Sequence, residues 1–113
     1  MNENLTLDDL AVPLRALRLL AADFGHLPAP GVQVSTIYPD RLDLRWYDDL
    51  AGFEAWREAL GIEPDAVEYR EQSAGRTRVL RASGVCAGAE LVLYGFGDVP
   101  VSAPATASAG GAA

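Results

Sequence analysis

The chain has 113 residues, of which 50% are hydrophobic and 22% charged, a composition that supports a buried core and excludes a largely disordered chain. Its formal net charge is −7, and the acidity lies in the first half, where residues 1–65 hold 12 acidic residues and 5 arginines. Polyanions are bound mainly by clusters of cations, so this charge argues against a general binder of nucleic acid or of anionic membranes.

The sequence contains no recognisable targeting or membrane segment. Its N-terminus, MNENLTLDDL, lacks a basic stretch followed by an apolar run, and no stretch approaches the roughly 18 apolar residues that span a bilayer. Cys86 is the only cysteine, which excludes an intrachain disulfide framework. We therefore expect a cytoplasmic protein without membrane association.

The first predicted element is an amphipathic helix, because apolar residues recur at steps of three and four: Leu10, Leu14, Leu17, Ala21 and Phe24. Thr6 followed by Asp9 suits a helix N-terminus. Pro13 leaves two alternatives, a separate turn over 7–12 before a helix that starts at the proline, or one helix that bends there. Gly25 is expected to end the helix in a left-handed conformation.

Two strands and a second helix are predicted next. Residues 32–36 and 42–46 alternate between apolar and polar side chains, and the turn between them falls at 38–41. Asp48 or Asp49 then caps a helix that ends at Gly61. Its apolar stripe consists of Leu50, Phe53, Trp56 and Leu60.

Three further strands complete the predicted order α, β, β, α, β, β, β. Residues 66–72 and 76–82 form a hairpin around the turn 73–75, and residues 90–96 form the last strand, with 84–88 as a flexible connection. The glycines around Phe96 suggest the end of an edge strand. The prediction is a two-layer α+β domain over residues 1–100, with two amphipathic helices on one mostly antiparallel sheet of about five strands. Residues 101–113 form a tail of small residues that we expect to be disordered.

No motif in the sequence indicates a catalytic, cofactor or metal site. His26 is the only histidine and has no nucleophile-elbow or thiol-protease context beside it. The acids at 40, 43, 48 and 49 do not follow the spacing of an EF-hand loop, and turn, strand and cap roles account for them. The segment Gly95-Phe96-Gly97 precedes no helix that could present amides to a phosphate. We expect no cofactor and lean away from an enzyme.

Six residues are candidates for contact with a partner: Trp46, Tyr47, Arg70, Arg76, Arg78 and Arg81. Neighbouring residues on a strand point to opposite faces, so Trp46 and Tyr47 cannot share one core, and one aromatic is expected on the outer face of the sheet. The four arginines are the only basic concentration in the chain. Either Glu68 and Glu71 pair with Arg76 and Arg78, which would share one strand face, or the arginines form a docking patch for an acidic surface or a phosphate.

These features favour a non-catalytic, regulatory or adaptor module that binds a protein partner or self-associates. The alternative is a small-ligand-binding protein or an enzyme with a carboxylate and arginine pocket, for which Asp43, Arg45 and Tyr47 are the candidates. A third hypothesis, an acidic mimic that occupies a nucleic-acid-binding protein, is weakened by the five arginines of the acidic half.

Overall fold

The computed structural model describes residues 5–99, and they form two helices and five strands in the predicted order. Short 3₁₀ turns precede the first helix and the third strand, at Leu7–Leu10 and Pro64–Ala66. The elements are α1 (Ala11–Phe24), β1 (Gly31–Val34), β2 (Arg41–Tyr47), α2 (Leu50–Ala59), β3 (Glu68–Gln72), β4 (Thr77–Cys86) and β5 (Ala89–Asp98). The predicted disordered tail lies outside the described residues.

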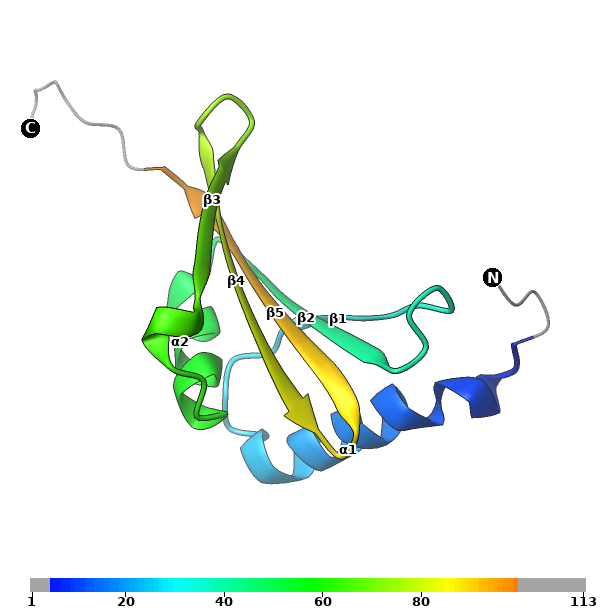
Figure 1. The fold of residues 1–113 in the computed structure, drawn as a ribbon. Helices are drawn as coiled ribbons and strands as arrows, with labels where there is room; N and C mark the ends of the chain where they lie inside the picture. The colour runs from blue at the N-terminus through cyan, green and yellow to red at the C-terminus, as the bar shows by residue number, and fades with distance from the viewer. Residues whose placement is uncertain (1–4, 100–113) are drawn as a thin grey trace, which may run out of the picture.

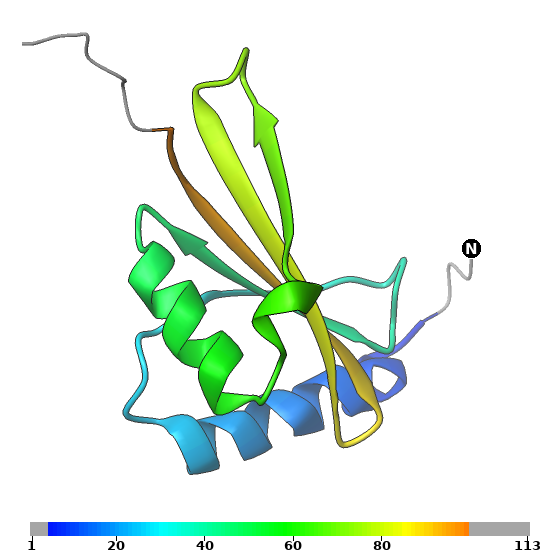
Figure 2. The same ribbon diagram turned by 60° about the vertical axis from the view of Figure 1, so that its left-hand side comes forward.

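The five strands form one sheet in the order β1-β2-β5-β4-β3. Three of the four strand pairs are antiparallel, as expected for hairpins, whereas β2 and β5 run parallel at the centre of the sheet. Both helices contribute to one hydrophobic core with the same side of the sheet, so the domain has two layers (Figures 1 and 2). The predicted α+β architecture is confirmed.

The fourth and fifth strands, β4 and β5, are longer than the sequence suggested. β4 continues through the segment that we expected to be a flexible connection, and a two-residue turn at Ala87 and Gly88 joins it directly to β5. Both turn residues have positive φ, which suits a tight hairpin between twisted strands. The edge-strand interpretation of Gly95 and Gly97 is wrong, because β5 is the middle strand of the sheet.

The start of α1 resembles the first of the two predicted alternatives. A separate 3₁₀ turn precedes the helix, which begins at Ala11, so that Pro13 occupies its third position. The first N–H groups of a helix have no partner within it, and a proline there removes no helical hydrogen bond. Gly25 does not adopt the expected left-handed conformation. Its φ is −61°, and a Cβ at this position would lie 2.8 Å from the carbonyl oxygen of Ala21.

The second helix follows the prediction at both ends. Asp49 is the N-cap, and its carboxylate accepts a hydrogen bond from the N–H of Gly52 at 2.9 Å. At the other end Gly61 has a φ of +73°, and its N–H donates to the carbonyl of Glu58 while Ile62 donates to that of Arg57. These two bonds form a Schellman motif, which turns the chain toward β3.

Four aromatic side chains form the centre of the core. Trp46 on β2 contacts Phe53 and Trp56 of α2, and Trp56 makes an edge-to-face contact with Phe24 of α1. The indole N–H of Trp56 donates to the carbonyl of Pro28 at 2.7 Å, and that of Trp46 lies 3.4 Å from the same oxygen. The connector between α1 and β1 therefore supplies the acceptor that buried tryptophans need.

No helix among the described residues is long and apolar enough to cross a membrane.

Two glycines bring α2 close to β5. A Cβ at Gly95 would lie 2.9 Å from Leu50 and 3.0 Å from the ring of Phe53, and a Cβ at Gly97 would lie 3.0 Å from Leu50. Such contacts are shorter than ordinary van der Waals distances. The inner side of β5 therefore carries leucines in its first half and glycines in its second half, and the glycines accept the side chains of the helix.

We predict that Gly95→Ala lowers the free energy of unfolding by about 1–3 kcal/mol, because the methyl group overpacks the contact with Leu50 and Phe53. Gly84→Ala on β4 is the matched control, since its Cβ would lie 3.4 Å from Ile62, at the edge of ordinary contact. Urea unfolding of both variants measures the difference. Equal stability of Gly95→Ala and the wild-type chain would contradict the proposed close packing.

Candidate functional site

One face of the sheet carries no helix in the described part of the chain. The core cluster includes Leu42, Leu44, Leu91 and Leu93, so these side chains mark the face that the helices cover. Since side chains alternate along a strand, the residues between them point the other way. This outer face carries Arg41, Asp43, Arg45 and Tyr47 on β2, Glu90, Val92, Tyr94, Phe96 and Asp98 on β5, and Thr77, Val79, Arg81, Ser83 and Val85 on β4.

Three rings on the outer face form an aromatic row: Tyr47, Phe96 and Tyr94. Tyr47 and Phe96 are register partners on the two parallel strands, and their rings stack with centroids 4.9 Å apart and planes 8° from parallel. Phe96 and Tyr94 are two residues apart on β5, with centroids 6.1 Å apart. Tyr47 is 61% exposed and ends the row. The row therefore offers a large, ordered apolar surface beside solvent.

Three arginines surround Tyr94, and we refer to Arg41, Arg45 and Arg81 as the arginine cluster. Arg45 and Arg81 lie beside Tyr94 in register, from the strands on its two sides, with their guanidinium carbons 5.0 and 6.0 Å from the ring centroid. Arg41 donates a hydrogen bond to the Tyr94 hydroxyl at 2.9 Å. Tyr94 therefore contacts all three arginines: Arg45 and Arg81 through its ring, and Arg41 through its hydroxyl group.

Among residues 5–99, Asp43 is the only carboxylate that forms an ion pair with Arg41 or Arg45. Its Oδ1 accepts from Nε of Arg41 at 2.7 Å, and its Oδ2 lies 3.5 Å from a guanidinium nitrogen of Arg45. The residue is 8% exposed, so the pair with Arg41 is partly shielded from water. The hydrogen bond to Asp43 raises the pKa of Arg41 above its ordinary value, and the interaction with Tyr47, followed by that with Asp43, raises the pKa of Arg45.

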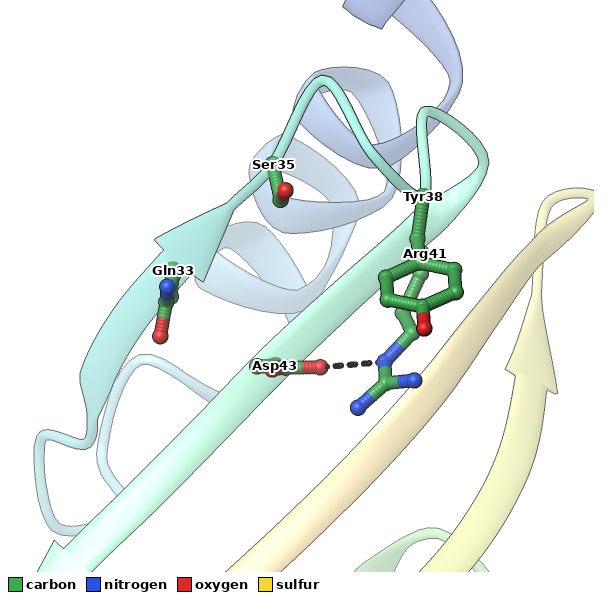
Figure 3. Close-up of a pocket in the computed structure, with 5 residues that line it drawn as sticks. All are labelled: Gln33, Ser35, Tyr38, Arg41 and Asp43. Atoms are coloured by element: carbon green, nitrogen blue, oxygen red, sulfur yellow. Dashed lines mark hydrogen bonds and ion pairs between the residues drawn. The ribbon is translucent and has the colours of Figure 1, made fainter. Parts of the chain in front are cut away.

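A small polar hollow lies at the edge of this cluster. Figure 3 shows Gln33 on β1 and Arg41 and Asp43 on β2, with the ring of Tyr38 over the guanidinium of Arg41. The distance from that ring centroid to the guanidinium carbon is 4.9 Å. The hollow has a volume of only about 10 Å³, which suffices for a water molecule and for no larger ligand.

Three of the six predicted partner-binding residues lie on the outer face. Tyr47 belongs to the aromatic row and Arg81 to the arginine cluster, and Arg70 joins them because it pairs with Val79. Arg70 and Arg81 line a shallow hollow of about 200 Å³ between β3 and β4. Arg81 lies 3.8 Å from Glu68, whereas the sequence suggested Arg76 and Arg78 as the partners of Glu68 and Glu71.

The other three predicted residues do not join this face. Trp46 is 2% exposed in the core, so its choice as a partner contact is wrong, and Tyr47 is the aromatic that points outward. Arg78 lies on the side of the sheet that the helices cover, 3.8 Å from a Cβ position at Gly97 and in register with Glu71. Arg76 lies in the turn before β4.

The sequence analysis did not single out Arg41, Tyr94 and Phe96 on the outer face, and it named Arg45 only for the alternative ligand pocket. A signal was present in the segment Tyr94-Gly95-Phe96-Gly97, where large aromatic residues alternate with glycines. Such alternation indicates a strand with one tightly covered face and one face that carries bulky side chains. What the sequence did not contain was the parallel pairing that places Tyr47 beside Phe96.

A separate apolar cleft of about 170 Å³ lies between α1, the connector before β1, and β1 itself. Its walls include Leu17, Leu20, Phe24, Leu27, Val32 and Trp56, and no charged side chain lines it. The carboxylate and arginine pocket of the alternative hypothesis therefore does not coincide with this cleft. Asp43 and Arg45 instead lie together on the open sheet face, where Tyr47 is their neighbour along β2.

The remaining residues considered from the sequence lie apart from the outer face. His26 is exposed in the turn after α1, and Cys86 is half-buried at the end of β4 against the core. Within residues 5–99 no three histidine, cysteine or acidic side chains gather closely enough to hold a metal ion.

Comparisons of the chain with protein-family models, with curated proteins and with solved structures find no match.

We predict that Asp43→Ala lowers the free energy of unfolding by about 1–3 kcal/mol, because it leaves the guanidinium groups of Arg41 and Arg45 without their shared acceptor. Asp43→Asn keeps an oxygen acceptor and should lose less. Thermal and urea unfolding of the two variants test this order. The opposite order, with the asparagine variant the less stable, would show that the carboxylate does not hold the arginines in place.

Proposed function

We propose that this chain is a non-catalytic protein-interaction module that binds its partner through the outer face of its sheet. The observation that supports the proposal most strongly is the aromatic row beside the arginine cluster, on a sheet face that no helix covers in residues 5–99. Tyrosine and arginine are enriched at the positions that contribute most to protein–protein binding. We also propose that the chain acts in the cytoplasm, as expected from the sequence.

The chemistry of the outer face suits an interface. Its floor is apolar, because Val79 and Val92 are buried there although neither belongs to the core between sheet and helices. Around this floor stand charged groups of both signs, including the arginine cluster, Glu90 and Asp98. An apolar centre with a charged and polar rim is the usual arrangement of a specific interface.

Regulation of a partner and self-association are both compatible with this function, and they differ only in the identity of the bound chain. The strands β2 and β4 flank β5, and the outer face spans all three without a gap, so it can support a broad contact. Rings that already stack lose little conformational freedom when a partner binds, which lowers the entropic cost of association.

We predict that Tyr47→Ala weakens partner binding by about tenfold or more, because it removes the exposed end of the aromatic row. Tyr69→Ala is the matched control: Tyr69 is 55% exposed, but it lies on β3 in register with Leu80 and so points to the other side of the sheet. Native mass spectrometry of the chain purified gently from its own cells measures the fraction that retains a protein partner or a second copy.

The two variants separate a specific face from general stickiness. Loss of the complex in Tyr47→Ala and its retention in Tyr69→Ala would support the proposal. A bare monomer in the wild-type preparation, or equal loss in both variants, would contradict it and shift attention to the apolar cleft and its ligands.

A further inference from the structure

We infer that the partner of the outer face is a second copy of this chain, bound through the same face in a symmetric dimer. This inference rests on the proposed function and names the partner that the function leaves open. Two properties of the face support it: its charges cancel, and its most exposed apolar side chains lie where a symmetric contact can cover both.

The charges of the outer face are balanced, although the chain as a whole is acidic. Of the 9 arginines and 16 acidic residues in the sequence, four of each lie on the strands of this face. The net charge of −7 is therefore carried by the rest of the sequence. The four arginines are Arg41, Arg45, Arg70 and Arg81, and the four acids are Asp43, Glu68, Glu90 and Asp98.

This balance distinguishes between classes of partner. An acidic protein gains no net attraction from a neutral face, and a basic protein is attracted to the acidic remainder of the chain instead. A second copy presents an identical neutral face, so two outer faces can meet without the repulsion that other surfaces of two chains of charge −7 would experience. The outer face is thus the side through which this acidic chain can best bind itself.

Groups of opposite sign also lie next to one another on the face, as a self-complementary surface requires. Asp43 lies between Arg41 and Arg45 on β2, and Glu68 on β3 is in register with Arg81 on β4. In a two-fold symmetric interface every contact between two different residues occurs twice. Each arginine that meets an acid of the second copy is therefore matched by the same pair on the other side of the axis.

The two most exposed apolar side chains of the outer face lie at opposite corners of the surface formed by β2, β5 and β4. Tyr47, at the end of β2, is 61% exposed, and Val85, on β4, is 79% exposed. Val85 is in register with Glu90, which is in register with Arg41 at the start of β2. Two-fold symmetry lets Tyr47 of each copy cover Val85 of the other, as the inner faces of two packed sheets cover one another.

The first experiment is sedimentation equilibrium of the full-length chain, purified alone, from micromolar to millimolar concentration. We expect a reversible equilibrium between the 12.0 kDa chain and its dimer. Added salt should strengthen the dimer severalfold, because it screens the repulsion between two acidic chains more than the close ion pairs of a buried interface. Dissociation of the dimer by salt would contradict the inference.

Two charge reversals test whether the two outer faces meet. Glu90→Arg makes the face basic and Arg70→Glu makes it acidic, and both residues are exposed, so both variants should fold. Each variant alone should dimerise about tenfold more weakly than the wild-type chain, because its two faces now carry like charge. An equimolar mixture should recover the dimer as a heterodimer, which native mass spectrometry distinguishes by mass.

Matched controls place the same charge reversals outside the outer face. Glu58→Arg on α2 and Arg18→Glu on α1 change exposed residues on the side of the sheet that the helices cover. Each should alter dimerisation far less than the corresponding variant of the outer face. A mixture of the two controls should show no preference for the heterodimer.

Recovery of the dimer in the mixture of Glu90→Arg and Arg70→Glu is a result that a merely structural role of these residues does not produce. The inference is overturned if the wild-type chain is a monomer at every concentration, or if both variants of the outer face dimerise as the wild type does. A monomer that retains a different protein from its own cells, and loses it in Tyr47→Ala, would overturn this inference alone and leave the proposed interaction face standing.

Discussion

The parallel pairing of β2 with β5 determines both sides of this domain. On the inner side it sets Leu42, Leu44 and Trp46 beside Leu91, Leu93 and Gly95, and so creates the surface on which the helices pack. On the outer side the same register sets Arg45 beside Tyr94 and Tyr47 beside Phe96. A shift of one residue would exchange the two faces, so that burial of the core also fixes the arrangement of the outer face.

The two faces of β5 differ in bulk as well as in polarity. Toward the helices the strand presents small residues at Gly95 and Gly97, which allow Leu50 and Phe53 to approach its backbone. Toward the outer side it presents Tyr94 and Phe96, which lean on side chains of the neighbouring strands. Close packing on one side holds the strand against α2, and the rings on the other side stand on that fixed backbone.

The sequence predicted the elements well because each carries its own periodic pattern and its own termini. The spacing of Phe53 and Trp56, with Asp49 before and Gly61 after them, is a local signal, and the observed helix follows it. The site was predicted less well, because alternation shows which side chains share a face of one strand but not which strand lies alongside. Trp46 and Tyr47 were recognised as opposed, yet only the burial of Trp46 against α2 decides which of them faces solvent.

The position of β3 gives the outer face one rigid part and one adaptable part. All five residues of β3 are exposed, and the strand is the last in the sheet, held by its pairing with β4 alone. Few buried contacts protect its hydrogen bonds, so its amide protons should exchange with solvent well before those of β2 and β5. Arg70 therefore lies on an edge strand with few protecting contacts, whereas Tyr94 and Phe96 lie on β5, the central strand of the sheet. For the proposed interaction, such a difference would combine a fixed anchor at the centre of the face with a border that can adjust to a partner.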